Sequence, residues 1–163
     1  MTLGGIGTSG TDSVNPVAYL DSNVFIYSLE GPDDVAVPAN QFFLAMRQRP
    51  GALATSELTL AEVLGPSRGE PRSPLLRRAY IDLLVWGRFI RLDPISRDIL
   101  YETAELRKIT PLKLPDASHL ATAIAAHCAF FLPRDRDFKR LPKRMELVLP
   151  TAAGFSRVLT AAG

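Results

Sequence analysis

Short apolar runs alternate with longer segments of helical periodicity along most of this chain. A short apolar run bounded by polar residues is typical of a strand buried in a sheet. Apolar residues that repeat every three or four positions are typical of a helix with one face in the core. The pattern predicts strands at residues 17–20, 51–55, 89–92, 129–132 and 146–149.

Between these strands the periodicity changes to that of helices. The clearest amphipathic repeat lies in residues 75–84, and Gly31-Pro32-Asp33-Asp34 is predicted to break the chain between two earlier helices. Alternating strands and helices favour an α/β fold, here a three-layer α/β/α sandwich with a central, mostly parallel sheet. Helices are predicted from residue 23 onwards and at 39–47, 56–64, 75–84, 96–109 and 115–127.

The ends of the chain differ from its middle in composition. Residues 1–16 are rich in Gly, Ser and Thr and predict a flexible tail, residues 17–149 predict one folded domain, and residues 150–163 predict a tail or a short helix. Residues 1–16 lack the basic and apolar regions of a signal peptide. No apolar run approaches the ~20 residues of a membrane span. We therefore expect a cytoplasmic protein.

Composition narrows the function only a little. The 163 residues fit one domain, 47% of them are hydrophobic and 22% charged, and Cys128 is the only cysteine. A single cysteine excludes an intrachain disulfide and a cysteine-rich zinc site. The net charge of +2 and the sequence pI near 8.9 neither require nor exclude a nucleic acid partner. Any electrostatic argument therefore depends on where the charges lie.

Four acidic residues each lie beside a predicted apolar element. Asp21 ends the first strand, Glu62 lies in the helix at 56–64, Asp116 opens a later helix, and Asp135 follows the fourth strand. Sites in parallel sheets gather at the carboxyl ends of the strands, so we expect these acids to converge. Converging carboxylates repel one another unless a cation neutralises them, and all-oxygen ligands favour Mg²⁺ or Mn²⁺. Such a site suits hydrolysis of phosphodiesters by one or two metal ions.

Four segments, in this order and spacing, resemble the PIN-domain nucleases and most closely the VapC toxins of bacterial toxin–antitoxin pairs. The resemblance implies a Mg²⁺- or Mn²⁺-dependent endoribonuclease that hydrolyses RNA. It further implies a homodimer and a cognate VapB-like antitoxin that inserts a peptide into the active-site groove. The segments are residues 19–23, 56–64, 116–123 and 135–138, within a similarity that covers about residues 17–149.

The resemblance assigns roles to individual residues. It implies that the catalytic metal-site acids are Asp21, Glu62, Asp116 and Asp135, and that Asn23 supports the first of them. The chain departs from the family at Pro133-Arg134, where the family commonly has Thr-Asn. Proline has no hydroxyl to offer to the site, so Asp137 is a possible substitute for the fourth ligand.

Two further features border the acids. His119 follows Asp116 by three residues; a supporting role is favoured over that of a general base. A basic stretch beside Asp135 predicts contacts to RNA phosphates, with a solvated loop as the alternative. Its predicted RNA-binding residues are Arg134, Arg136, Lys139 and Arg140. The rival functions are a PIN nuclease of RNA processing or turnover without an antitoxin, and a catalytically silent RNA-binding module.

Overall fold

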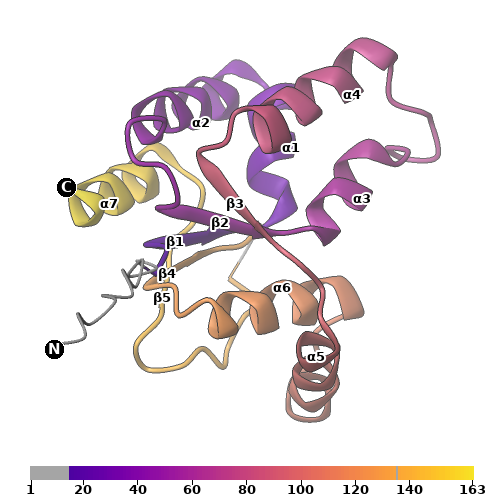
Figure 1. Cartoon of the computed structure of the whole chain (residues 1–163), viewed down its shortest axis with the longest axis vertical. Coiled ribbons are helices and arrows are strands. Elements are labelled where there is room, and N and C mark those ends of the chain that lie inside the picture. Colours follow the sequence, from indigo (N-terminus) through magenta and orange to yellow (C-terminus); the bar gives the residue numbers. More distant parts are fainter. Residues whose placement is uncertain (1–14, 135) are drawn as a thin grey trace, which may run out of the picture.

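Five parallel strands form the centre of the molecule in the computed structural model, which describes residues 15–134 and 136–163 (Figure 1). Their order in the sheet is β3-β2-β1-β4-β5. In the central pairs Ala18 lies opposite Leu53 on one side and Phe130 on the other. The strands are β1 (Ala18–Leu20), β2 (Leu53–Ser56), β3 (Ile90–Asp93), β4 (Phe130–Leu132) and β5 (Glu146–Leu147).

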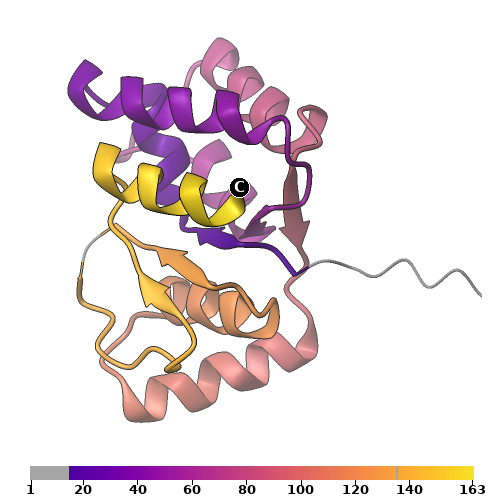
Figure 2. The same cartoon turned by 90° about the vertical axis from the view of Figure 1, so that its left-hand side faces the viewer.

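Helices cover both faces of this sheet, which confirms the predicted α/β/α sandwich (Figure 2). Helices α1 to α4 and α7 lie on one face, and α5 and α6 lie on the other. None of the described helices is long and apolar enough to cross a membrane. The bounds are α1 (Ser22–Glu30), α2 (Asp33–Met46), α3 (Leu58–Leu64), α4 (Pro74–Ile81), the π-helical turn η1 (Asp82–Trp86), α5 (Arg97–Ile109), α6 (Leu114–Ala125) and α7 (Ala152–Ala162).

Each face of the sheet has its own apolar core. The core under α2 and α7 is rich in aromatic rings, and Phe42 stacks on Phe155 with ring centroids 4.6 Å apart. The core under α5 and α6 contains Leu106, Leu120 and Phe131. Of the two alternatives for residues 150–163, a tail or a short helix, the structure has a helix, and Phe155 is buried.

Several helices differ from the predicted bounds, and two of them do so for reasons that the structure shows. The predicted break at residues 31–34 is confined to Gly31 and Pro32, because Asp33 and Asp34 belong to the first turn of α2. Acidic residues favour that turn, where the helix dipole is positive. The repeat at 75–84 begins as α4, which Ser73 caps by accepting a hydrogen bond from the Leu76 amide, and then widens into the π-helical turn.

The strand order places a crevice at one edge of the sheet. The chain proceeds outward from β1 to β2 and β3, and then crosses back to place β4 on the other side of β1. The segments that follow β1 and β4 pack on opposite faces of the sheet, so the carboxyl ends of these two strands border an opening. Asp21 directly follows β1, and Arg134 lies two residues beyond β4. Both residues therefore border the crevice.

Candidate active site

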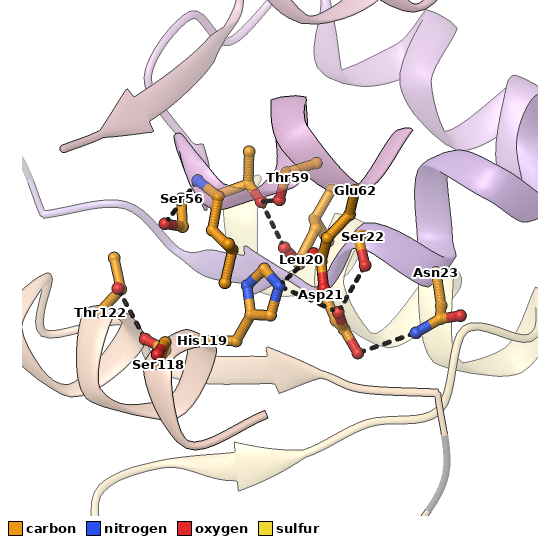
Figure 3. A network of polar contacts seen from close by, with 12 residues as sticks. Leu20, Asp21, Ser22, Asn23, Ser56, Thr59, Glu62, Ser118, His119 and Thr122 are labelled. Atoms are coloured by element: carbon orange, nitrogen blue, oxygen red, sulfur yellow. Dashed lines mark hydrogen bonds and ion pairs between the residues drawn. The ribbon is translucent and has the colours of Figure 1, made fainter. Parts of the chain in front are cut away.

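The carboxylate of Asp21 is oriented by its two neighbours in the chain. Asp21 is 2% exposed and precedes the first turn of α1. Its Oδ1 accepts a hydrogen bond from the Ser22 hydroxyl and its Oδ2 accepts one from the Asn23 amide, both at 3.1 Å (Figure 3). Its backbone amide donates to the carbonyl of Leu132 in β4. Both carboxylate oxygens are thus held at the end of β1, one by Ser22 and one by Asn23.

Glu62 and His119 reach Asp21 from opposite faces of the sheet. Glu62 comes from α3 and His119 from α6, and Figure 3 shows the three side chains converging. His119 Nε2 lies 2.7 Å from Glu62 Oε2 and 3.5 Å from Asp21 Oδ1. One donor atom from each of these residues lies within 4.8 Å of the others. The fold therefore joins two of the predicted acids through a histidine.

The imidazole of His119 is buried and bonded at both nitrogens. Because an ionised carboxylate only accepts, Nε2 carries the hydrogen that is shared with Glu62. Nδ1 lies 2.7 Å from the hydroxyl of Tyr19. Burial lowers the pKa of His119, but the Glu62 hydrogen bond and the charges of Asp21, Glu62 and Asp116 outweigh it, so the pKa lies above its ordinary value. The neighbouring carboxylates thus stabilise the protonated, positively charged form of the His119 ring.

A pair of threonines fixes the backbone next to Asp21. The Thr55 hydroxyl lies 2.7 Å from the carbonyl of Leu20 and 2.7 Å from the hydroxyl of Thr59. All of these groups are buried. The bond from Thr55 joins β2 to the last residue of β1, and Thr59 extends the link into the first turn of α3. The strand that ends at Asp21 and the helix that carries Glu62 are therefore held together.

An open cavity of about 490 Å³ adjoins Asp21. Asp116, in the first turn of α6, is half-buried and lines this cavity with Asp21. Asp116 is not in the group of donor atoms within 4.8 Å, but its charge acts on His119. Lys113 also lines the cavity. The space beside the acids is thus bordered by both negative and positive side chains.

The segment after β4 supplies the rest of this cavity. Asp135, the predicted fourth acid, lies outside the described residues, so its role stays a prediction. Asp137, the possible substitute, is exposed and lines the cavity. Among the predicted RNA-binding residues, Arg134 and Lys139 line the same cavity, whereas Arg140 lines an adjacent cavity of about 180 Å³, and Arg136 is exposed and lines neither.

Several residues of the site were not marked by the sequence, and Ser22, Tyr19 and Lys113 are examples. Ser22 is adjacent to Asp21, and its hydroxyl donates to the Asp21 carboxylate. Tyr19 lies within an apolar strand, where nothing local marks it as a partner of His119. Lys113 precedes a proline-initiated helix, a position that predicts a boundary and no contact to a ligand. Ser22 alone carried a usable signal, its position beside the strand-ending acid.

Comparisons with known proteins identify the family of this chain and structures of similar fold. A family model described as the PIN domain matches residues 18–144. A chain of a toxin–antitoxin complex from Klebsiella pneumoniae is 27% identical, with a TM-score of 0.58 over 82% of this chain and 97% of that chain.

Two more distant structures share the fold. VapBC2 from Rickettsia felis, bound to a DNA fragment from its promoter, is 18% identical, with a TM-score of 0.57 over 81% of this chain and 97% of that chain. FitAB bound to an IR36 DNA fragment is also 18% identical, with a TM-score of 0.57 over 82% of this chain and 94% of that chain. No curated protein sequence matches significantly.

The predicted resemblance to PIN-domain toxins of toxin–antitoxin pairs is confirmed by these similarities. The PIN-domain model spans most of the folded part of the chain, including Asp21, Glu62, Asp116 and His119. This chain therefore belongs to the PIN-domain family, whose members are nucleases.

Proposed function

We propose that this protein is a Mg²⁺- or Mn²⁺-dependent endoribonuclease that acts as the VapC-type toxin of a toxin–antitoxin pair. The observation that carries the proposal is the convergence of Asp21 and Glu62, from separate elements, beside a cavity that Asp116 also lines. Carboxylates gathered at one edge of the sheet suit a divalent cation, and the cavity is large enough to admit part of a nucleic acid backbone.

The donor atoms fit a hard cation. Opposite ligands of Mg²⁺ lie roughly 4.2 Å apart, since each bond is about 2.1 Å long. One carboxylate oxygen of Asp21 and one of Glu62 lie within 4.8 Å of each other, which is compatible with that spacing. We assign the metal to the oxygens of Asp21, Glu62 and Asp116, with Asp135 or Asp137 as the fourth acid. His119, whose Nε2 donates to Glu62, supports the ligands.

Several residues act on the ligands and not on the metal. Ser22 and Asn23 each hold one oxygen of Asp21, and His119 holds Glu62. Such outer partners orient ligating carboxylates and commonly affect metal affinity by about 10–100-fold. A bound divalent ion would supply a Lewis acid for the phosphodiester and an activated water for the attack.

The cations of the cavity suit an RNA backbone. Lys113, Arg134 and Lys139 are exposed and line the same space as Asp21. Their charges would hold phosphates beside the acids, which by themselves would repel RNA. This arrangement supports RNA as the substrate, with one strand lying along the cavity.

The toxin role is supported by the similarity to the Klebsiella complex. The match covers 97% of that chain at 27% identity. We therefore propose a VapB-like antitoxin as the partner of this protein, a homodimer as its assembly, and the cytoplasm as its compartment. Copurification of the chain with the product of a neighbouring small reading frame would separate this role from that of an RNA-processing nuclease.

The function is tested by incubating the purified protein, freed of any partner, with structured and single-stranded RNAs. We expect cleavage in Mg²⁺ or Mn²⁺ and none in EDTA, because carboxylates cannot replace the Lewis acid that the metal ion would supply. Gel analysis of end-labelled RNA would locate the cut. Cleavage that persists in EDTA would contradict the metal assignment. Tight Mn²⁺ binding without cleavage of any RNA would favour the catalytically silent module.

Neutralising the two cavity cations after β4 should weaken RNA binding. For the Arg134→Gln/Lys139→Gln double variant we expect the slope of log affinity against log salt to decrease by about 1.4, since each phosphate contact on a single strand contributes about 0.7. Fluorescence anisotropy with a labelled RNA would measure it. The matched control is Arg78→Gln/Arg157→Gln, which removes two exposed cations from α4 and α7. If the slope of log affinity against log salt is the same for both double variants, residues 134–140 are better interpreted as a solvated loop.

A further inference from the structure

A buried arginine outside the cavity contacts the backbone of Glu62. Arg72 lies between α3 and α4, and its side chain is 5% exposed. One of its terminal nitrogens, Nη1, donates to the carbonyl of Glu62 at 3.2 Å and to the carbonyl of Gly65 at 2.6 Å. Arg72 therefore binds the end of the short helix that carries a proposed metal ligand.

The end of α3 needs such a partner. The last four carbonyl groups of a helix receive no hydrogen bond from within the helix, and the carbonyl of Glu62 is one of these four. A helix of only seven residues, Leu58–Leu64, is unstable in isolation and depends on tertiary contacts for its position. A positive charge at this end is also favoured by the helix dipole. The guanidinium of Arg72 supplies both the donors and the charge.

The same guanidinium is tied to the helix that begins next to Asp21. Arg72 Nε donates to Glu30 Oε1 at 2.7 Å, and Glu30 is the last residue of α1. The hydroxyl of Tyr80 in α4 donates to the same Glu30 oxygen, and the Arg72 guanidinium carbon lies 5.7 Å from the centre of the Tyr80 ring. Figure 1 shows α1, α3 and α4 grouped on one face of the sheet, where they contact one another.

We infer that Arg72 is a positioning residue that sets the distance between Glu62 and Asp21 by clamping the end of α3 to the end of α1. This inference rests on the proposed metal-dependent function. Among the described residues, Arg72 neither lines the cavity nor bonds a proposed ligand atom, so it acts through the backbone of α3 and through Glu30. A buried guanidinium at this place joins the helix that follows Asp21 to the helix that carries Glu62.

The test compares Arg72→Gln with Arg49→Gln, a matched control in which the lost donor serves the Leu159 carbonyl of α7. For Arg72→Gln we expect hydrogen exchange in residues 58–65 to accelerate severalfold without metal. We expect the Kd for Mn²⁺, measured by electron paramagnetic resonance, to rise about tenfold, as for other supporting partners of metal ligands. The value of kcat should fall and the KM for RNA should stay constant. At temperatures below its melting temperature, the Arg49→Gln control should have the wild-type hydrogen exchange in residues 58–65, Kd for Mn²⁺, kcat and KM.

Two milder variants keep the test decisive if Arg72→Gln does not fold. Arg72→Lys retains the charge without the forked donors, and Glu30→Gln retains an acceptor without the charge, so both should give intermediate Mn²⁺ affinities. Faster exchange in α3 with a wild-type Mn²⁺ Kd would reduce Arg72 to a structural residue and overturn the inference. Failure of the wild-type protein to bind Mn²⁺ would instead refute the proposed function itself, and the inference with it.

Discussion

Replacing Asp21 with asparagine is expected to reduce RNA cleavage by more than about a hundredfold. Losing a residue that only supports a metal ligand costs up to about a hundredfold, and Asp21 is proposed as a ligand itself. Asparagine keeps the size of the side chain but removes the negative charge that would hold the metal. Asp21 is 2% exposed, and its two oxygens are already oriented by Ser22 and Asn23. Initial rates with an end-labelled RNA in Mn²⁺ would measure the loss.

The same variant should fold and should lose its response to metal. One hydrogen bond to the side chain is lost in Asp21→Asn, so we expect the free energy of unfolding to change by only about 1–2 kcal/mol. A ligand that binds only the folded state at a hundred times its Kd adds about 2.7 kcal/mol to stability. Wild-type protein should therefore melt at a higher temperature in Mn²⁺, and Asp21→Asn should not.

A matched control is Asp34→Asn, which removes one carboxylate from the exposed first turn of α2. We expect this variant to cleave RNA and to respond to Mn²⁺ like the wild type. Cleavage by Asp21→Asn at a rate within a few-fold of the control would show that the site lies elsewhere. Comparison of Asp135→Asn with Asp137→Asn in the same assay would identify the fourth acid.

Replacing Phe155 with alanine is expected to destabilise the whole domain by about 3–5 kcal/mol. Phe155 is 3% exposed, and its ring stacks on Phe42 at a centroid distance of 4.6 Å. Removing it would leave a cavity between α7 and α2 in the aromatic core. Urea unfolding followed by circular dichroism would measure the free energy, and a single cooperative transition would show that α7 unfolds with the rest.

Ser156→Ala provides the control, because Ser156 is the next residue of α7 and its side chain is exposed. Its stability should change by less than about 0.5 kcal/mol, as is usual for a surface substitution. A loss of less than 1 kcal/mol in Phe155→Ala, comparable to the control, would contradict a core role for α7. It would favour a folded unit that ends near residue 149, as drawn from the sequence.

Most of the helices and strands could be predicted from the local pattern of hydrophobic residues. The residues at which they begin and end could not. The strand predicted at residues 17–20 is Ala18–Leu20, and the strand predicted at 129–132 is Phe130–Leu132. The start of α2 was misplaced because Gly31-Pro32 breaks the chain while Asp33 already favours a helical first turn. Such ends depend on which backbone groups find partners, and the partners are often distant in sequence.

Two of the acids proposed from the sequence, Asp21 and Glu62, converge in the structure, and most of the contacts around them could not be predicted. Asp21 was marked by its place at a strand end, and Asp116 by its place in the first turn of a helix. His119 was placed in a supporting role, and the structure adds the partners that the spacing could not provide: Glu62, Asp21 and Tyr19. The histidine lies on α6, across the sheet from Glu62, so no helical repeat relates the two residues.

Alternating hydrophobic segments and their end residues were enough to specify an α/β sandwich with acids at one edge of the sheet. Those signals depend on side chains a few residues apart, which is the range over which a helix or strand repeats. The contacts that shape the site span much longer separations. Glu62 meets His119 across 57 positions, Thr55 bonds Leu20 across 35, and Arg72 bonds Glu30 across 42. Only packing of the helices on the sheet brings these partners together, because each bond needs a geometry that no single element contains.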